Sequence, residues 1–410
     1  MSRNIITSLD IGTSTVQTLV AERVKEGRRF RVLGVGVAPA AGMRRGIVVD
    51  QEDASEAIRA SVEEASRGAG VPIYSAWMAV GGMHISVASS KGIVAVSRAD
   101  GEISGEDVRR AIAAAETFMS RNPNREILHL IPRRFRVDDE EGIRDPVGMR
   151  GVRLEADTIV VEGSASYVKG LVKSVEGAGV RVADYVFGPL AASSAVLTKQ
   201  QLEIGTIILD IGGGVASFIV FEEGVPLHAG VLPVGGNLIT HDVAIGFKTH
   251  VGVAEQIKCT YGSCHPSEFS KRENIRLAEF TTEETATYPR KELAEIIEAR
   301  LKDVFELLGK ELRKIGKRQL LPGGVVLIGG SSLIPGIVEL ARQEIGLPAE
   351  LGNPYGFDAP DRAIASSFAT AYGVLLWADT RMQDSSSMFS SRFSNLGKST
   401  LLRWFKSLLP

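Results

Sequence analysis

Two stretches of the chain carry the same order of apolar and polar positions. Residues 5–22 read IITSLDIGTSTVQTLVAE, and residues 205–222 read GTIILDIGGGVASFIVFE. In each stretch, Leu-Asp-Ile-Gly and a turn of small residues separate two apolar runs, which is the pattern of a β-hairpin. The repeat gives Asp10 and Asp210 equivalent positions, so it predicts two related halves that face each other across a cleft.

Outside the hairpins, strand-like runs are followed by helical ones, as in the helix expected within residues 50–70. This helix has Glu52 and Asp53 in its first turn, where acids interact favourably with the helix dipole. Gly68 and Gly70 follow its expected end. The alternation indicates a mixed α/β fold with duplicated halves.

Two segments differ in texture from the halves that they interrupt. Residues 85–165 contain a strand, a helix, a strand pair around 126–137 and an acidic loop at 138–148, and we expect a small inserted α+β domain there. Residues 237–320 are mainly helical and form a second insertion. The expected organisation is a first lobe at 1–84 and 166–203, the inserted domain at 85–165, a second lobe core at 204–236 and 321–378, the helical insertion at 237–320, a flexible linker at 379–394, and a terminal helix at 395–410.

The end of the chain has the pattern of an amphipathic helix that lies on a membrane. Residues 379–394 are Ser-rich, which is typical of a flexible linker. Ser399 is a suitable N-cap for the helix that follows. The alternative to a membrane helix is a terminal helix packed on the body of the protein. At about 100° per residue the apolar residues share one face and the cations lie opposite, as in interfacial helices. The apolar face consists of Leu401, Leu402, Trp404, Phe405, Leu408 and Leu409, and the cations are Arg403 and Lys406.

Composition excludes several classes of protein. The 410 residues include 47 Lys and Arg against 49 Asp and Glu, a net charge of -2 that argues against a nucleic-acid binder. Two cysteines give no disulfide framework and suggest a reducing compartment. No run approaches the length of a membrane-spanning helix, and the N-terminus lacks a signal-peptide pattern, so the expected location is cytoplasmic. The 44 glycines are the compositional excess.

The glycines cluster in turns that could bind a nucleotide. Glycine turns let backbone N–H groups approach phosphates closely, because no Cβ stands in the way. Asp10 and Asp210 would hold Mg²⁺ through water, since this ion keeps several waters and takes one or two carboxylates. The alternative is two tight hairpins with a structural Asp. The candidate residues are Gly12, Thr13, Ser14 and Thr15 in the first turn, Gly212, Gly213 and Gly214 in the second, and Gly329, Gly330 and Ser331 after a strand near the end of the second half.

Other candidate sites are weaker. Cys259, Cys264 and His265 could bind a metal, but three such residues without a fourth more often serve packing. The acidic run 138–141 is expected to be a solvated loop rather than an acid/base pair. A basic run at the end of the second insertion could bind an acidic partner or could simply end a helix, where the dipole favours cations. This run consists of Lys310, Arg313, Lys314, Lys317 and Arg318.

These motifs resemble those of the actin-like ATP-binding superfamily, which shares two hairpin phosphate loops and a glycine-rich adenosine motif. Within the superfamily the chain is similar to the bacterial cell-division protein family FtsA. The segment 126–156 resembles that family's inserted domain, and 234–247 and 254–258 resemble its sequence after the second phosphate loop. The similarity runs from residue 5 to about 378, and the tail is similar to the family's membrane-targeting helix.

The resemblance implies ATP and Mg²⁺ between the two lobes. Gly235, Gly236 and Asn237 would close on the phosphates, and Glu255 and Lys258 would lie near the ribose and adenine. The protein would assemble into filaments at the division septum, on the cytoplasmic face of the inner membrane, and bind its anionic lipids. Its partners would be the C-terminal tail of the ring protein FtsZ, docked on the second insertion, and later division proteins, with no nucleic acid.

Two departures from active relatives lower the expected rate of ATP hydrolysis. Gly188 stands where such relatives often carry Glu or Gln to orient water, and Val215 stands where a hydroxyl residue is usual. No catalytic residue is assigned, and we expect ATP binding with at most slow turnover. The alternatives are an actin-like protein of type IV pilus assembly or a small-molecule kinase of the same superfamily.

Overall fold

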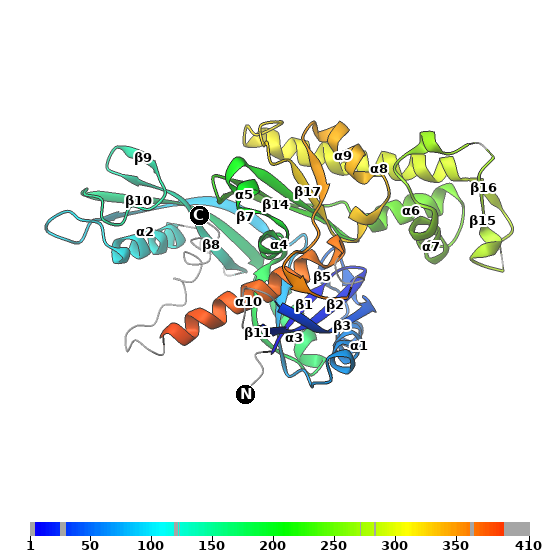
Figure 1. The fold of residues 1–410 in the computed structure, drawn as a ribbon, viewed down its shortest axis with the longest axis horizontal. Coiled ribbons are helices and arrows are strands. Elements are labelled where there is room, and N and C mark those ends of the chain that lie inside the picture. Colours follow the sequence, from blue (N-terminus) through cyan, green and yellow to red (C-terminus); the bar gives the residue numbers. More distant parts are fainter. Residues whose placement is uncertain are drawn as a thin grey trace.

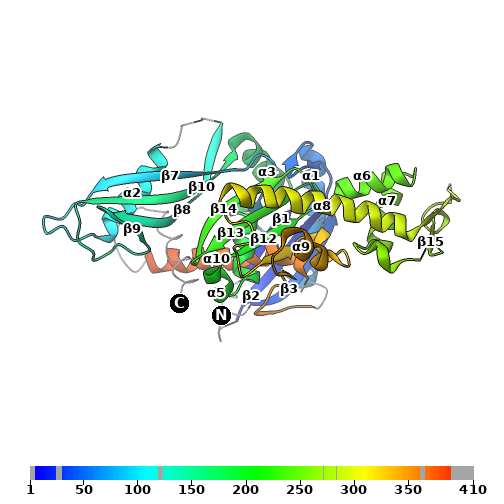
Figure 2. The same ribbon diagram turned by 90° about the horizontal axis from the view of Figure 1, so that it is seen from above.

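The structure is a computed structural model that describes residues 5–24, 30–118, 122, 124–270, 272–282, 284–360 and 365–388. The two lobes lie side by side, the inserted domain extends at one end, and the second insertion extends at the other (Figures 1 and 2). The terminal helix expected at 395–410, with its eight membrane residues, lies outside the described residues.

Each lobe is built on a sheet with the same order of five strands, to which β19 adds a sixth strand in the first lobe. In the first lobe the order is β11-β6-β1-β2-β3-β19, and in the second it is β14-β13-β12-β17-β18. In both, three antiparallel strands are followed by two parallel ones, so the expected duplication and the α/β class are confirmed. The first sheet comprises β1 (Ile5–Ile11), β2 (Thr15–Arg23), β3 (Phe30–Pro39), β6 (Ser75–Val80), β11 (Arg181–Phe187) and β19 (Phe357–Asp358), and the second β12 (Thr206–Ile211), β13 (Ala216–Glu222), β14 (Val225–Leu232), β17 (Val325–Ile328) and β18 (Ala349–Leu351).

The two predicted hairpins form in equivalent registers. Asp10 pairs with Gln17 across β1 and β2, and Asp210 pairs with Ser217 across β12 and β13. The apolar residues of all four strands except Ile5 are buried, which accounts for the continuous apolar runs in the sequence. Asp10 and Asp210 therefore occupy equivalent positions, one residue before the end of the first strand of each hairpin.

Helix α1 (Gln51–Ala69) follows the expected capping chemistry. The Asp50 side chain accepts hydrogen bonds from the backbone N–H groups of Glu52 and Asp53. Gly70 ends the helix in a left-handed conformation with φ 66°, whereas Gly68 lies inside the helix and not after it as expected. The helix covers strands β2 and β3, and a small hairpin, β4 (Met43–Arg44) and β5 (Ile47–Val48), precedes it.

The inserted domain is a four-stranded sheet with the order β7-β10-β8-β9, covered by α2. Two expectations within it are wrong. The segment 126–137 belongs to one long strand and not to a strand pair, and the acidic loop contains a strand that pairs with it. Long strands are favoured here because both edges of β8 find partners. The elements are β7 (Ser86–Ala95), α2 (Gly105–Phe118), β8 (Arg125–Val137), β9 (Glu140–Ile143) and β10 (Arg153–Ser164).

Ion pairs join the inserted domain to the second lobe. Arg134 pairs with Glu223 at 2.6 Å, and the Arg144 guanidinium lies 3.6 Å from the same carboxylate. The inserted domain therefore contacts both lobes, although it is inserted in the first.

The second insertion is mainly helical, as expected. A short hairpin at its tip interrupts the helices, and its longest helix runs back to the second lobe. Its elements are α6 (Gly236–Gly246), α7 (Val251–Tyr261), the 3₁₀ turns η1 (Pro266–Glu268) and η2 (Leu277–Glu279), β15 (Asn274–Arg276), β16 (Thr287–Pro289) and α8 (Arg290–Lys314).

Two helices cross between the lobes. They are α4 (Gly188–Val196), which leaves the first lobe, and α10 (Ala369–Met388), which returns to it and buries Tyr372 and Trp377 against it. The remaining helical elements are α3 (Ala165–Gly177), α5 (Lys199–Ile204), η3 (Gly330–Leu333), α9 (Ile337–Ile345) and η5 (Ser366–Phe368).

The prediction of a flexible linker at 379–394 is wrong for residues 379–388, because α10 continues to Met388. A helix that is already fixed by packing extends at little cost per residue, so Ser-rich composition alone does not end it. An ion pair between Arg23 and Asp379, at 3.4 Å, also holds this part of the helix. Within the described ranges, every helix is too short or too polar to traverse a bilayer.

The crossing of α4 and α10 gives a test of the fold. A Cβ on Gly373 would lie 2.2 Å from the backbone of Ala191, so Gly373→Ala should lower the free energy of unfolding by about 1–3 kcal/mol. Gly309, in the middle of α8, has no atom within 4 Å of a built Cβ. Gly309→Ala should therefore raise the free energy of unfolding by about 0.5–1 kcal/mol. Chemical denaturation of both variants measures this, and equal effects would contradict the crossing.

Candidate functional site

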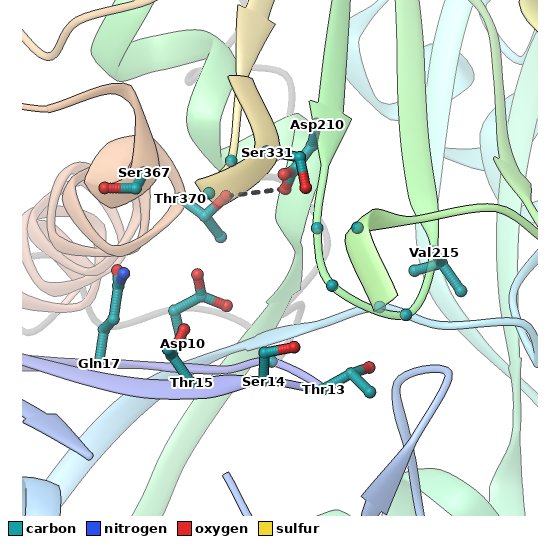
Figure 3. A pocket seen from close by; sticks show the side chains of 18 of the residues that line it. Asp10, Thr13, Ser14, Thr15, Gln17, Asp210, Val215, Ser331, Ser367 and Thr370 are labelled. Carbon is teal, nitrogen blue, oxygen red and sulfur yellow. Dashed lines mark hydrogen bonds between the residues drawn. The ribbon is translucent and has the colours of Figure 1, made fainter. Parts of the chain in front are cut away.

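A cavity of about 580 Å³ lies between the two lobes. Both hairpin turns, the start of α4, the start of α6, helix α7 and the end of β17 line it. Figure 3 shows Asp10 on one wall and Asp210 on another, with the glycine turn of the second hairpin beside them. The cavity therefore forms where the duplicated halves meet, as the repeat predicted.

The carboxyls of Asp10 and Asp210 lie deep in the protein and reach the solvent through this cavity. Burial, and after it the charge of Asp210, raise the pKa of Asp10 to about 7. Burial also raises the pKa of Asp210 to about 6, although a hydrogen bond from the Thr370 hydroxyl, at 3.3 Å, acts to lower it. Two acids in one low-dielectric site cannot both ionise at low cost, so a nearby cation would stabilise them.

The two glycine turns touch across the cleft. A Cβ on Gly213 would lie 2.0 Å from the Ser14 hydroxyl, and a Cβ on Gly214 would lie 2.5 Å from the Thr13 hydroxyl. Only glycine permits this approach. The Ser14 hydroxyl also donates to the side-chain oxygen of Asn237 at 2.9 Å, which links the lobes directly.

The start of α6 is held against the second turn. The backbone N–H groups of Gly236 and Asn237 donate to the carbonyls of Gly212 and Gly213, at 2.9 and 2.8 Å. Gly236 and Asn237 line the cavity, whereas Gly235 does not. The helix start thus positions the turn, and its first two N–H groups are already engaged.

Glu255 and Lys258 form a polar cluster on α7, in which Lys258 is buried and Glu255 is half-exposed. The Lys258 ammonium donates to Glu255 at 2.6 Å, to the Thr240 hydroxyl at 2.8 Å and to the carbonyl of Gly236 at 3.3 Å. Burial acts to raise the pKa of Glu255, but hydrogen bonds from Lys258 and Thr240 outweigh it and hold this pKa below its usual range. Both side chains line the cavity.

Gly329 directly follows strand β17 and lies next to Asp210. Its φ of 88° lies in the left-handed region, and a Cβ there would lie 2.3 Å from the Asp210 carboxylate. Gly330 and Ser331 continue into the 3₁₀ turn η3, and α9 begins only at Ile337. The strand end lines the cavity, but a 3₁₀ turn rather than an α-helix follows it.

The structure brings together nearly all of the residues expected from the sequence. Gly235 is the exception, since it stands behind the wall and not in it. The residues that line the cavity are Asp10, Gly12, Thr13, Ser14, Thr15, Asp210, Gly212, Gly213, Gly214, Gly236, Asn237, Glu255, Lys258, Gly329, Gly330 and Ser331.

Gln17 and Ser217 also line the cavity and were missed by sequence reasoning. Each stands directly opposite an aspartate in its hairpin, and each is nearly buried, with 7% and 6% of its surface exposed. The signal was a polar residue within an apolar strand, at a position that the hairpin register places beside the Asp.

The residues present fit a nucleotide with a divalent cation. Glycine turns, hydroxyls and a buried ammonium suit phosphate and ribose oxygens, and two carboxylates suit Mg²⁺. Among the described residues, no group of three or more His, Cys, Asp and Glu side chains could hold a metal. Asp10 and Asp210 would therefore hold the ion together with water and phosphate oxygens, and the nucleotide would supply the phosphates.

The departures expected to slow turnover lie in the cavity wall. Gly188 is the first residue of α4 and faces the cavity without a side chain, and Val215 adds an apolar side chain at the second turn. Neither supplies a group that could orient water.

Comparison with known proteins shows the family. Residues 207–373 match the model of cell division protein FtsA, and residues 82–162 match that of the SHS2 domain inserted in FTSA. Cell division protein FtsA of Borreliella burgdorferi is 37% identical over 379 residues, 92% of this chain and 91% of the relative. FtsA of Bacillus subtilis is 36% identical over 377 residues, 92% of this chain and 84% of the relative. The chain therefore belongs to the FtsA family of cell-division proteins.

Solved structures confirm the actin-like fold. The PilM-PilN type IV pilus biogenesis complex matches with a TM-score of 0.66 at 18% identity, over 92% of this chain and 99% of the other. MreB 5 of Spiroplasma citri bound to AMPPNP matches with a TM-score of 0.56 at 12% identity, over 94% and 99%. At these identities the likeness concerns the fold alone.

The raised pKa of Asp10 predicts how stability depends on pH. Between about pH 4 and 7 the folded nucleotide-free protein binds a proton at Asp10 that the unfolded chain releases, so its free energy of unfolding falls as pH rises. Asp10→Asn should remove this loss and stabilise the nucleotide-free protein at pH 8, by on the order of 2–4 kcal/mol, with little difference near pH 4.

Denaturant unfolding at several pH values, without nucleotide or Mg²⁺, measures this effect. Glu56→Gln, on the exposed face of α1, is the matched control and should leave the pH dependence unchanged. A constant difference between Asp10→Asn and the wild type at all pH values would show that burial does not perturb this carboxyl.

Proposed function

We propose that this member of the FtsA family binds ATP with Mg²⁺ between its lobes, assembles into filaments on the inner membrane and tethers FtsZ there. The observation that supports nucleotide binding best is the pair of buried carboxylates between glycine turns in one interlobe cavity. An MreB relative of the same fold is described as bound to AMPPNP.

The chain's own residues have separable roles in this proposal. Asp10 and Asp210 hold the hydrated cation, the two turns offer backbone N–H groups and hydroxyls to the phosphates, and the cluster of Glu255 and Lys258 faces the ribose and adenine. Mg²⁺, when bound, neutralises phosphate charge. Turnover is slow, because Gly188 supplies no group to orient the attacking water.

ATP acts as an assembly switch by differential binding. The two walls of the cavity belong to different lobes, and the Ser14–Asn237 hydrogen bond joins them when the cleft is closed. A ligand that contacts both walls favours the closed arrangement over an open one. Filaments then form preferentially from the closed protein.

FtsZ and the membrane use surfaces away from the cleft. The acidic tail of FtsZ docks on the second insertion, where the exposed cations Arg313 and Arg318 carry most of the electrostatic attraction. The other cations of that run pair within the chain, so a merely structural role suits them better. These pairs are Lys310 with Glu306 at 2.8 Å, Lys314 with Glu311 at 2.7 Å and Lys317 with Glu222 at 2.6 Å.

Removal of one carboxylate tests the nucleotide site. MgATP should raise the unfolding temperature of the wild type, and a chelator should remove most of that rise. Asp210→Asn should fold but bind MgATP about tenfold or more weakly, because it loses a partner of the hydrated ion. Glu56→Gln is the control that should bind normally. Equal MgATP affinity of Asp210→Asn and the wild type, by titration calorimetry, would refute the assignment of Asp210.

Removal of the tail tests the tether. The full chain should sediment with vesicles that contain anionic lipid and should carry FtsZ with it, whereas a chain that ends at Met388 should remain in the supernatant. Trp404→Asp, on the apolar face of the tail, should weaken vesicle binding, and Ser407→Ala, on the polar face, should not. Vesicle binding by the shortened chain would place the membrane contact elsewhere.

A further inference from the structure

Gln17 is a buried polar side chain whose oxygen lacks a partner. It lies on β2 with 7% of its surface exposed and lines the interlobe cavity. No hydrogen bond reaches its Oε1 atom from the described residues. Figure 3 shows the side chain on the same side of the hairpin as Asp10, directed into the cavity. An orphaned acceptor of this kind is destabilising, so its presence indicates a partner that the described residues do not supply.

The position of Gln17 limits the identity of that partner. Gln17 is the direct cross-strand neighbour of Asp10, so the two side chains emerge on one face about 5 Å apart at Cβ. A carboxamide has an oxygen that accepts and an N–H₂ group that donates. Beside a hydrated cation and a phosphate, such a group can accept from water and donate to a phosphate oxygen at the same time.

We propose that Gln17 orients the water that attacks the γ-phosphate in the slow hydrolysis of ATP. This inference rests on the proposed binding of ATP in the cavity. Oε1 accepts a hydrogen bond from the water, and the N–H₂ group donates to a γ-phosphate oxygen. The residue makes these contacts without taking a proton.

The hydrolytic step balances without a further reactant. The water oxygen forms a bond to the γ-phosphorus, and the bond from that phosphorus to the β–γ bridging oxygen breaks. The bridging oxygen keeps the electron pair and leaves as ADP. One water hydrogen stays on the attacking oxygen and the other moves to a γ-phosphate oxygen, so the released phosphate carries both.

The rest of the cavity wall offers few substitutes for Gln17. Asn237 is the other carboxamide that lines the cavity in the described part of the chain, and its oxygen already accepts from Ser14. Ser217, the counterpart of Gln17 in the second hairpin, has a much shorter side chain. Gly188 has none. A residue on the first hairpin thus supplies a function that the start of α4 lacks.

Substitution of Gln17 separates binding from hydrolysis. Gln17→Met keeps the volume and removes both hydrogen-bonding groups, and Gln17→Glu keeps an acceptor and removes the donor. In the full-length protein both should slow single-turnover hydrolysis of MgATP by about tenfold or more. For Gln17→Met the dissociation constant of MgATP should change less than about threefold, because an interaction made chiefly in the transition state lowers kcat and not affinity. Gln343→Ala, on the exposed face of α9, is the matched control.

The outcomes distinguish this inference from the proposed function. If the wild type does not bind MgATP, the proposed function fails. If the wild type binds MgATP but releases no phosphate, or if Gln17→Met binds and hydrolyses it at the wild-type rate, the role of Gln17 is overturned. If Gln17 had only a structural role, its substitution would lower the unfolding temperature and the MgATP affinity together. Gln17→Glu and Gln17→Met would then have the same effects on both quantities.

Discussion

The burial of two carboxyl groups in one cavity is the constraint on which the rest of the structure depends. Asp10 and Asp210 come from different lobes, yet the fold brings both to one cavity where burial raises the pKa of each. In the described part of the chain, a hydrogen bond from Thr370 to Asp210 offsets part of this cost. A closed cleft with both groups ionised therefore needs a cation, and this need couples the charge at the centre to the arrangement of the lobes.

Contacts farther from the centre act on the same closed arrangement. The glycine turns touch across the cleft, and α4 and α10 cross at Gly373 with their backbones in contact. The inserted domain adds the ion pair of Arg134 with Glu223 across to the second lobe. Exposed ion pairs contribute little each, whereas the packed crossing allows little change without a steric clash. The crossing is thus the fixed part, and the cleft and the inserted domain are the parts that can respond.

Much of the fold could be predicted from the sequence, because the decisive signals were local and repeated. The pattern of apolar residues predicts the two Leu-Asp-Ile-Gly hairpins, and their repetition implies the duplicated sheets and the cavity between them. The misses arise where distant contacts decide. Helix α10 runs through part of a Ser-rich segment because its first turns are packed, and the acidic loop contains β9 because β8 offers it a free edge. Gly235 fails as a wall residue because the turn of the second hairpin lies in front of it.

Gln17 is a site residue that the pattern of apolar and polar positions does not reveal without the strand register. As one of several polar residues in a largely apolar strand it attracts no attention, but the register places it opposite Asp10, just as it places Ser217 opposite Asp210. The duplicated hairpins are therefore alike in backbone and unlike in chemistry. A phosphate between them would meet a carboxamide on one side, a hydroxyl on the other, and no side chain from Gly188. Since fast cleavage requires donors organised on every side of the reacting group, this asymmetry would favour long retention of an intact nucleotide, and the closed arrangement would last as long as the nucleotide stayed bound.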